Sequence, residues 1–574
     1  MAQLPRREEE RRLAALGIRE QAAQVASERP RMADENNDDE VTFRSFIGNY
    51  SKGLEHDQYG DPIPASYASL LRALQSRDPQ DFDNIDLGGA LKLTNPQAGL
   101  AFDLEGAEAQ EVAEQPAPSF GSAQTAHEMG ELYWMAISRD VPFVDYGTAP
   151  EIADAIDSLN SEFPLYTGDP PERAVTDLRN VFRGFFVGEE VGPYVSQFLL
   201  KGNSDPRKAV GQGRNASDGY IAYGSRVIDQ RQQTVLPGTD YLLDHPWWLE
   251  VQNGRDRRGE DQFDFTQRRF IRNLRDGGNF VHFDLVIDAW YNTAFYLLSE
   301  PMGDQQTPGN MKVPMRDREF PFNVGNPYSA NGFVSPTQGG FATFGDPHVV
   351  EVMTEVIGQA FRTVWWQKWG VHRRLRPEEY GGRVDNQLSG RRTYDNEPID
   401  WQSLLDSLSL PNGGLSPWIG TGHLAIRFPS SYLLPQAFPE GAPTHPAYGA
   451  GHATVSAACA TILKAFFDEK MVIKNPMQSN ADGTALVPYQ GDDQGDMTVE
   501  TELNKLSGNI SQFRNAAGVH WRSDDTFSRL LGEQVAIRLL QELSLTFNED
   551  RAFFQLTKLD GTLIRISDGV VAAV

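Results

Sequence analysis

The sequence predicts a mainly helical fold, and three observations support this prediction. Apolar residues recur at three- and four-residue intervals in the segments 349–369, 455–467 and 526–543, a spacing that gives a helix one buried face. Stretches rich in Gly, Asn, Asp and Pro separate the helical patterns, as loops do. Clear two-residue alternation, the mark of a strand, is confined to the C-terminus.

The chain divides into three parts. Residues 1–40 mix Arg and Glu at helical spacing and end in the acidic run ADENNDDE, which indicates a charged arm, either a solvated helix or an oligomer contact. Residues 41–548 hold the helical patterns and form the predicted helical body. Residues 549–574 contain FFQLTKL and TLIRIS on either side of Asp560-Gly561, which predicts a β-hairpin with a two-residue turn.

Three polar stretches interrupt the body, at 105–122, 381–399 and 476–497. The first is punctuated by proline, and the other two are rich in Gly, Asn, Asp and Gln. Clusters of these residues between periodic segments are typical of turns, so we interpret all three stretches as surface loops.

Composition excludes several classes of function. Lys plus Arg total 52 against 79 Asp plus Glu, a net charge of −27, which argues against nucleic acid or an anionic membrane as the main partner. The single cysteine, Cys459, lies in an apolar helical pattern and excludes a disulfide framework or a multi-thiolate metal site. The N-terminus carries charges where a signal peptide needs an apolar stretch, so we expect cytoplasmic residence by default.

The first candidate segment is Lys368-Trp-Gly-Val-His-Arg-Arg-Leu-Arg376-Pro377, and its two cations of interest are Lys368 at the start and Arg376 near the end. Gly370 weakens the preceding helix, and Pro377 biases Arg376 towards an extended conformation. Lys368 and Arg376 can therefore leave a common helix face and point at one site. Taken alone, such a run is usually a solvated face.

Two histidines flank a glycine turn in the second segment, His445-Pro-Ala-Tyr-Gly449-Ala-Gly451-His452. The apolar period that begins at Val455 predicts a helix starting near His452. A helix start directs free backbone N–H groups at whatever occupies the turn, and an anion is favoured there. The alternative is an ordinary glycine-rich loop that leads into a core helix.

The third segment is Arg514-Asn-Ala-Ala-Gly518-Val-His520-Trp-Arg-Ser-Asp524. Gly518 permits a break that brings Arg514 and His520 inward together. Asp524 lies one helical turn beyond His520, where a carboxylate fixes the tautomer of the imidazole and raises its basicity. Together the three segments supply three cations, a backbone N–H cradle and an oriented imidazole, which suits a tetrahedral oxyanion such as phosphate or vanadate. A zinc site fits less well, since His-x6-His lacks helical spacing.

The motifs K-x7-R-P, H-P-x-Y-x-x-G-H and R-x5-H-W-R-S-D, in this order, resemble the vanadium-dependent haloperoxidases, specifically the algal and cyanobacterial bromoperoxidase branch. The resemblance extends through LLPQAFPEGAPTHPAYGAGHATVSAACATILKAFFDE and through FATFGDPH at 341–348. It covers most of the chain from about residue 40. It implies two four-helix bundles that meet around a vanadate site, with a small C-terminal β-hairpin.

The resemblance also implies roles for the candidate residues. Lys368, Arg376, Gly451 and Arg514 would bind the vanadate oxygens, and His520 would ligate vanadium. His452 would be the acid–base group, and His445 would tune protons near bound peroxide. Vanadate would act as a Lewis acid on hydrogen peroxide, Lys368 would make one peroxide oxygen more electrophilic, and halide, with bromide as first choice, would be oxidised to hypohalous acid that halogenates small organic acceptors.

One residue departs from the family pattern. Relatives usually have Ser immediately before the Gly-His pair, where this chain has Ala450. One neutral hydrogen bond to vanadate, worth about 1 kcal/mol net, is therefore missing unless a water replaces it. Gln367 occupies a position that varies with halide preference among relatives.

Two other functions remain open at this point. The family resembles certain acid and lipid phosphatases at the same residues, and in a phosphatase His520 would be the nucleophile and His452 would protonate the leaving group. A non-catalytic, oligomeric anion-binding protein is the second alternative. Relatives in this branch form large homo-oligomers, often dodecamers, and the arm and hairpin are plausible contacts.

Overall fold

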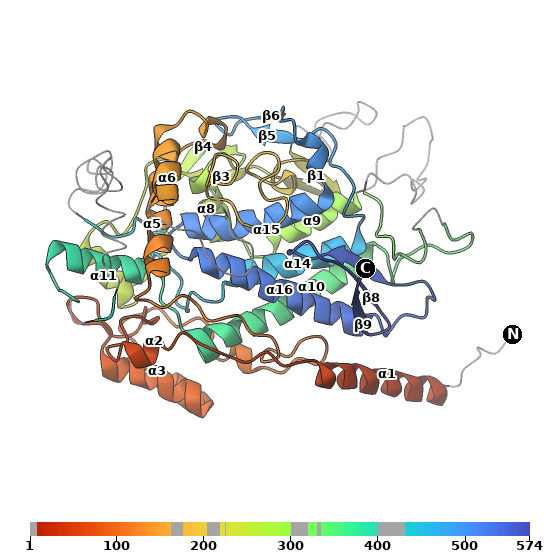
Figure 1. Cartoon of the computed structure of the whole chain (residues 1–574), viewed down its shortest axis with the longest axis horizontal. Coiled ribbons are helices and arrows are strands. Elements are labelled where there is room, and N and C mark those ends of the chain that lie inside the picture. Colours follow the sequence, from red (N-terminus) through yellow and green to blue (C-terminus); the bar gives the residue numbers. More distant parts are fainter. Residues whose placement is uncertain are drawn as a thin grey trace.

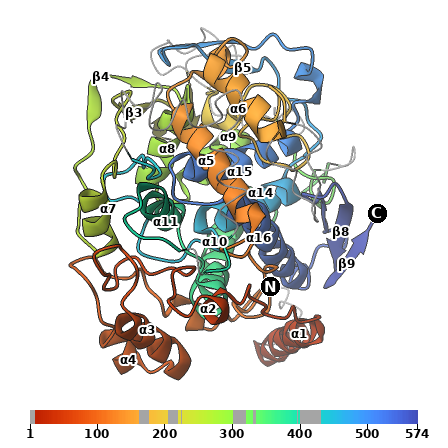
Figure 2. The same ribbon diagram turned by 60° about the vertical axis from the view of Figure 1, so that its left-hand side comes forward.

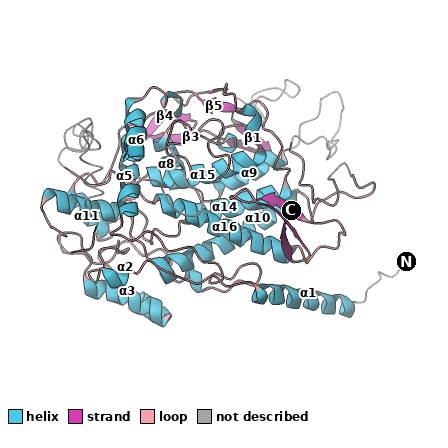
Figure 3. Cartoon of the chain, in the orientation of Figure 1, coloured by secondary structure: helices cyan, strands magenta, loops and turns pink. Residues whose placement is uncertain are grey.

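The computed structural model describes residues 8–161, 176–203, 219–223, 225–299, 320–329, 334–394, 397–399 and 431–574. Helices dominate this part of the chain, and the strands form only small antiparallel sheets (Figure 3). The predicted mainly helical class is confirmed. Among the described helices, none is both long enough and apolar enough to cross a membrane.

The core of the molecule is a four-helix bundle in which α14 packs along three neighbours (Figure 1). Its helices are α10 (Asp346–Trp365), α14 (Gly451–Phe466), α15 (Val499–Ala516) and α16 (Arg522–Leu543). The three periodic sequence segments fall in α10, α14 and α16, so the apolar spacing identified them correctly. Cys459 is fully buried in α14 and contacts the main hydrophobic core.

A second set of helices packs on this bundle, with α8 and α5 against α15 and α9 against α14. The set consists of α5 (Ala123–Ile137), α6 (Pro150–Ser161), α8 (Leu274–Phe283) and α9 (Asp288–Leu298). Other helices lie around the bundle: α2 (Asp39–Thr42), α3 (Pro64–Ser76), α4 (Pro79–Asp83), α7 (His245–Gln252) and α11 (Pro377–Ser389). These elements bring the C-terminal ends of α8, α10 and α15 and the start of α14 to one end of the bundle.

The N-terminal helix α1 (Glu8–Glu28) stands apart from the body, and all its residues are at least partly exposed (Figure 2). Arg29 anchors its end, since the guanidinium pairs with Glu542 on α16 at 2.7 Å and donates to the carbonyl of Gly106 at 3.2 Å. Leu13 and Leu16 on α1 are 57% and 50% exposed. The separate arm boundary at residue 40 stays a prediction.

The strands form two-stranded pairs near the surface and one three-stranded sheet at the C-terminus. The pairs are β1 (Tyr220–Tyr223) with β2 (Arg226–Asp229), β3 (Gln232–Val235) with β4 (Phe263–Arg269), and β5 (Met477–Ser479) with β6 (Leu486–Pro488). The C-terminal sheet has the order β7 (Phe554–Thr557), β8 (Leu563–Ser567), β9 (Val570–Ala573).

The C-terminal hairpin is confirmed, with two differences from the prediction. Its connection is longer than two residues, because the last β7–β8 pair is Thr557 with Leu563, and Gly561 takes a φ of 86° inside the turn. The third strand, β9, pairs with β8 in register Ile566 to Val571. Its four residues are all exposed, so the apolar alternation on which the hairpin prediction relied did not mark it.

Two of the polar stretches were wrongly interpreted as surface loops, and the third, 476–497, contains the paired strands β5 and β6. Residues 381–389 belong to helix α11, in whose first turn the Glu379 carboxylate accepts from the backbone N–H of Arg376 at 2.7 Å. Much of 105–122 is buried, and Ala109, Glu114 and Phe120 are at most 4% exposed. This segment runs behind the glycine turn, where Gln367 and Asp39 accept hydrogen bonds from its backbone. Composition cannot reveal such partners.

Candidate active site

The second and third motif segments meet at a cavity of about 260 Å³ at the end of the bundle. His445, Gly451, His452, Arg514 and His520 all line it. The first segment lies behind this lining and reaches it through Arg376, which contacts His445 and His520. The cavity wall also includes Val281 and Asp284, at the end of α8, and Trp365, at the end of α10. Five of the predicted site residues, from positions spread over 75 residues of sequence, are thus brought together at one cavity.

Gly518 lies at a break between two helices in the third segment, as the sequence predicted. Helix α15 ends at Ala516, Gly518 adopts a φ of 87°, and α16 begins at Arg522. A β-carbon at this φ would be strained. The break turns His520 and Arg514 towards the same cavity.

The His520 ring is oriented by a carboxylate. Its Nδ1 lies 2.8 Å from Oδ2 of Asp524, which in turn accepts from Arg374 through Oδ1 at 2.9 Å. Because an ionised carboxylate only accepts, Nδ1 carries the proton and Nε2 presents its lone pair. Burial lowers the pKa of His520 well below its usual value, and Arg376 and Lys368 lower it further. A neutral imidazole with a lone pair at Nε2 is the form that binds a metal centre, and in this structure Arg376 Nη1 donates to that lone pair at 2.9 Å.

Arg376 connects the first segment to both of the others. Its Nη1 lies 2.9 Å from His520 Nε2 and donates to the carbonyl of Val519 at 2.7 Å, while Nη2 lies 2.8 Å from His445 Nδ1. Its backbone is extended, with φ −81° and ψ 153°, as Pro377 predicted. Burial lowers the pKa of Arg376 to about 10, so the guanidinium remains a cation at neutral pH.

Lys368 lies one layer behind the cavity wall. It belongs to a π-helical turn, η6 (Trp366–His372), that continues α10. Its Nζ donates to the carbonyls of Pro446 at 2.7 Å, Ala447 at 3.1 Å and Gly449. Burial lowers the pKa of Lys368 well below its usual value, with Arg376 adding to the effect. Lys368 therefore fastens the glycine turn.

The glycine turn leads directly into α14, whose first residue is Gly451. The first N–H groups of a helix have no partner within the helix, so those of α14 face the cavity mouth as donors for an anion. A β-carbon on Gly451 would lie 3.2 Å from the Trp365 ring, so glycine keeps this approach open. Ala450 is 3% exposed, and its N–H donates to Ser528 Oγ at 2.7 Å.

The two turn histidines occupy different surroundings. His452 Nε2 lies 3.0 Å from Oδ1 of Asp284, a partner that the sequence motifs did not indicate. Burial lowers the pKa of His452, and Asp284 opposes this effect. His445 faces Arg376 and lies with its ring 5.0 Å from that of Trp365. Burial lowers the pKa of His445 well below its usual value, and Lys368 and Arg376 lower it further.

Arg514 is a buried cation in the lining of the cavity. Its Nη1 donates to the carbonyl of Val281 at 2.8 Å, and its guanidinium lies 5.4 Å from the centre of the Phe438 ring. The Nε atom is buried and has no hydrogen-bond partner among the described residues. Burial lowers the pKa of Arg514 to about 10. A buried donor without a partner is costly, so Nε has capacity to bind a ligand oxygen.

Gln367 lies away from the cavity. Its side-chain nitrogen donates to the carbonyl of Val112 at 3.1 Å and to Asp34 at 3.2 Å, and its oxygen faces His372 Nε2 at 3.2 Å. Gln367 thus joins the π-helical turn to the N-terminal segments. Its hydrogen bonds with described residues do not include His445 or His520.

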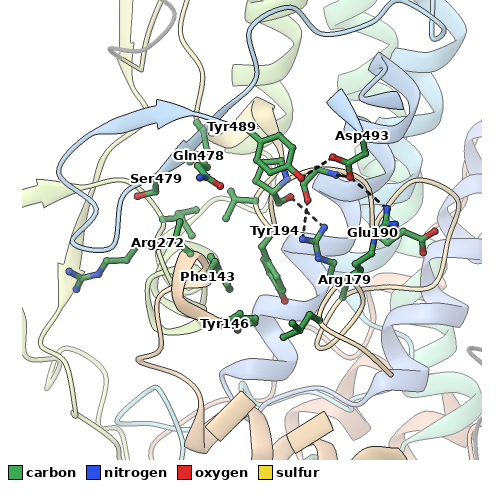
Figure 4. A pocket seen from close by; sticks show the side chains of 18 residues that line it. Phe143, Tyr146, Arg179, Glu190, Tyr194, Arg272, Gln478, Ser479, Tyr489 and Asp493 are labelled. Carbon is green, nitrogen blue, oxygen red and sulfur yellow. Dashed lines mark hydrogen bonds and ion pairs between the residues drawn. The ribbon is translucent and has the colours of Figure 1, made fainter. Parts of the chain in front are cut away.

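A second cavity, of about 300 Å³, lies elsewhere in the molecule and shares no lining residue with the first (Figure 4). Its ionic groups are largely matched within the protein: Asp493 accepts from Tyr489 and Gly192 at 2.8 Å each, and Arg183 donates to the carbonyls of Glu189 and Gly192. Stacked rings of Phe143 and Tyr194 form another side. It has no histidine in its lining, so the first cavity is the candidate active site.

Comparisons with known proteins agree with this geometry. Residues 424–549 match the family described as VCPO second helical-bundle domain. The vanadium-dependent bromoperoxidase of Corallina officinalis is 36% identical over 96% of this chain and 98% of its own length. The enzyme of the same name from Ascophyllum nodosum is 30% identical over 88% of this chain and 84% of its own length.

A solved structure is also similar over almost the whole chain. The second vanadate-dependent bromoperoxidase from Ascophyllum nodosum, described as homohexameric, superposes with a TM-score of 0.81 at 27% identity. The superposition covers 99% of this chain and 92% of that one. The helical arrangement seen here is therefore shared by that bromoperoxidase.

Proposed function

Because the chain belongs to the vanadium-dependent bromoperoxidases, we propose that it oxidises halide with hydrogen peroxide at a vanadate held in the cavity described above. Bromide is the proposed halide, since the curated relatives are bromoperoxidases. The product is hypohalous acid or an equivalent oxidised halogen, which halogenates small organic acceptors.

The residues at the cavity fit vanadate. Vanadate is a small, multiply charged oxyanion. The buried Nε of Arg514, which no described residue accepts from, is suited to one of its oxygens. The N-terminus of α14 at Gly451 supplies backbone donors, and Arg376 supplies a second guanidinium. His520 Nε2 would bind vanadium, since Asp524 holds the other ring nitrogen. We place Lys368 as the cation that secures the turn and contributes charge behind it.

When bound, vanadate supplies Lewis acidity that polarises hydrogen peroxide without a change in metal oxidation state. The protein supplies electrostatic stabilisation through the buried charges of Lys368, Arg376 and Arg514, which act more strongly in a water-poor site than in solution. His520 keeps a neutral, correctly oriented ring. Each of these contributions is fixed in place before substrate arrives.

His452 is the proposed proton carrier. Asp284 holds Nε2, which leaves Nδ1 for exchange with a reacting oxygen. Its lowered pKa keeps the ring neutral at neutral pH, so it can accept a proton from incoming hydrogen peroxide and return it to the leaving water. His445, held by Arg376, is placed to assist the transfer from the opposite side of the turn.

A homo-oligomer is the proposed state of the protein. The solved relative is a homohexamer, and the exposed leucines of α1 together with the exposed strand β9 offer contact surfaces. We propose a larger assembly, up to a dodecamer. Light scattering coupled to gel filtration measures the mass directly, and a monomer would contradict this part of the proposal.

Vanadate dependence is the direct test of the function. Adding vanadate to the apo-protein should produce bromination of a phenolic dye that requires both peroxide and bromide. The same cradle would accept a phosphate ester, so hydrolysis of a phosphomonoester without vanadate would instead support a phosphatase. If the protein shows neither bromination nor hydrolysis, the result would favour a protein that only binds anions.

A further inference from the structure

Glu114 is a buried acid directly behind the anion-binding turn. It lies in the segment 105–122, and only 4% of the residue is exposed. Its backbone N–H donates to Gln367 Oε1 at 3.4 Å, which joins it to the residue before Lys368. The backbone of Glu114 is therefore connected to one part of the cradle.

The carboxyl group of Glu114 packs against another part of the cradle, Gly449. A β-carbon at Gly449 would lie 2.2 Å from Glu114 Oε1 and 2.9 Å from Oε2, so the carboxyl occupies the space that a side chain at 449 would need. Lys368 donates to the carbonyl of the same Gly449. The two residues thus hold one peptide from two sides.

Within the part of the chain that the structure describes, neither oxygen of the Glu114 carboxyl has a partner in good hydrogen-bond geometry. The groups that face it are Ser528 and Asp524 on α16, Tyr448 in the turn and Lys368 in the π-helical turn. Burial raises the pKa of Glu114 to about 8 and Asp524 adds to this, while Ser528, Lys368 and Tyr448 oppose it. The carboxyl is therefore mainly protonated at neutral pH.

A protonated Glu114 preserves the positive charge of the cradle. A carboxylate at this position would attract Lys368 and repel an oxyanion on the other side of the turn, since charges in a poorly solvated site are weakly screened. We propose that Glu114 is a positioning residue whose neutral carboxyl supports Gly449 and leaves the charge of Lys368 to the bound anion, and whose ionisation weakens anion binding. This proposal deepens the proposed function and rests on it.

The sign of the pH dependence follows from linkage. If the anion binds only when Glu114 is neutral, the apparent affinity falls by up to about tenfold for each pH unit above the pKa of Glu114. Replacing the carboxyl of Glu114 with a permanently neutral amide of the same shape should remove this fall in affinity. A purely space-filling role would leave the pH dependence unchanged.

The experiment compares wild type with Glu114→Gln, using inorganic phosphate as the probe and equilibrium dialysis as the readout. Because both proteins bind the same ligand, the ionisation of phosphate itself cancels in the ratio of their dissociation constants. We expect a ratio near one at about pH 6 and roughly tenfold tighter binding by Glu114→Gln at about pH 9. Vanadate dialysis should give the same ratio.

Glu533→Gln is the matched control. Glu533 is also buried, has a pKa raised by burial and accepts from the backbone N–H of Leu559 at 2.6 Å, near the C-terminal sheet. The phosphate affinity of the Glu533→Gln variant should equal that of wild type at every pH. A constant ratio for Glu114→Gln, or a loss of affinity at acidic pH as well, would overturn the inference.

Two results separate this inference from the proposed function. Phosphate binding with equal pH dependence in both proteins would overturn the role of Glu114 alone, whereas no binding of phosphate or vanadate by either protein would overturn both. Should Glu114→Gln fail to fold, calorimetry of phosphate binding to wild type in several buffers replaces it. Proton uptake by the protein at about pH 9 is then expected, and its absence would overturn the proposal.

Discussion

Asp524 Oδ2 lies 2.8 Å from Nδ1 of His520, and the other carboxylate oxygen accepts from Arg374 at 2.9 Å. All three side chains are at most 3% exposed. This buried row of hydrogen bonds fixes the tautomer of the His520 imidazole and directs Nε2 at the cavity. The position of the proposed vanadium ligand is therefore set by two residues that do not touch the cofactor.

Asp524→Asn should weaken vanadate binding without abolishing it. The amide can still accept from Nδ1, but it carries no charge to raise the basicity of the ring and leaves Arg374 with less compensation. Loss of such a supporting partner typically costs 10- to 100-fold in metal affinity, roughly. Equilibrium dialysis with vanadium analysis measures this, and unchanged affinity would show that the carboxylate charge is irrelevant.

His520→Ala should abolish tight retention of vanadate, because it removes the only proposed direct bond from protein to metal. Dialysis of the reconstituted protein followed by elemental analysis measures retention. His245→Ala is a suitable control, since His245 packs beside Trp248, away from the cavity. Equal vanadium contents in His520→Ala and wild type would contradict the assignment.

Asp284→Asn should change the pH dependence of turnover. The pKa of His452 is lowered by burial and partly restored by Asp284, so removing the charge lowers it further. His452 then stays neutral to lower pH, so the acid limb of the rate profile moves to lower pH. The maximum rate falls, because Nε2 of His452 loses the carboxylate that holds it. A shift of the limb to higher pH would contradict the role of Asp284.

Ala450→Ser should preserve or improve vanadate affinity. Ala450 precedes the first turn of α14 and makes no side-chain cap there, and Ser is favoured at this position. Its hydroxyl adds either a cap or one bond to the anion, worth about 1 kcal/mol, or about fivefold in affinity. A large loss measured by dialysis would show that this turn is arranged differently from its relatives.

The three motif segments were predictable because local rules govern them. Pro377 sets the extended backbone of Arg376, Gly518 sets the break before His520, and the i, i+4 spacing sets the contact of His520 with Asp524. The apolar spacing likewise located α10, α14 and α16. Each of these rules acts within a few residues, so the sequence displays it directly.

The remaining partners were not predictable because they come from distant parts of the chain. Asp284 reaches His452 across 168 positions and follows α8 without any motif. Glu114 was placed in a surface loop because its neighbours are polar, yet tertiary contacts bury it behind Gly449. The cationic run predicted Lys368 as a site residue, but its carbonyl partners in the turn depend on how α10 meets α14.

Vanadium content and halide dependence, measured together on one preparation, test the central claim most directly. After reconstitution and exhaustive removal of free vanadate, elemental analysis should give about one vanadium per chain, as one direct imidazole ligand requires. The same sample should then consume peroxide only when bromide is present. A protein that retains no vanadium, or whose peroxide-dependent rate is indifferent to bromide, would contradict the account.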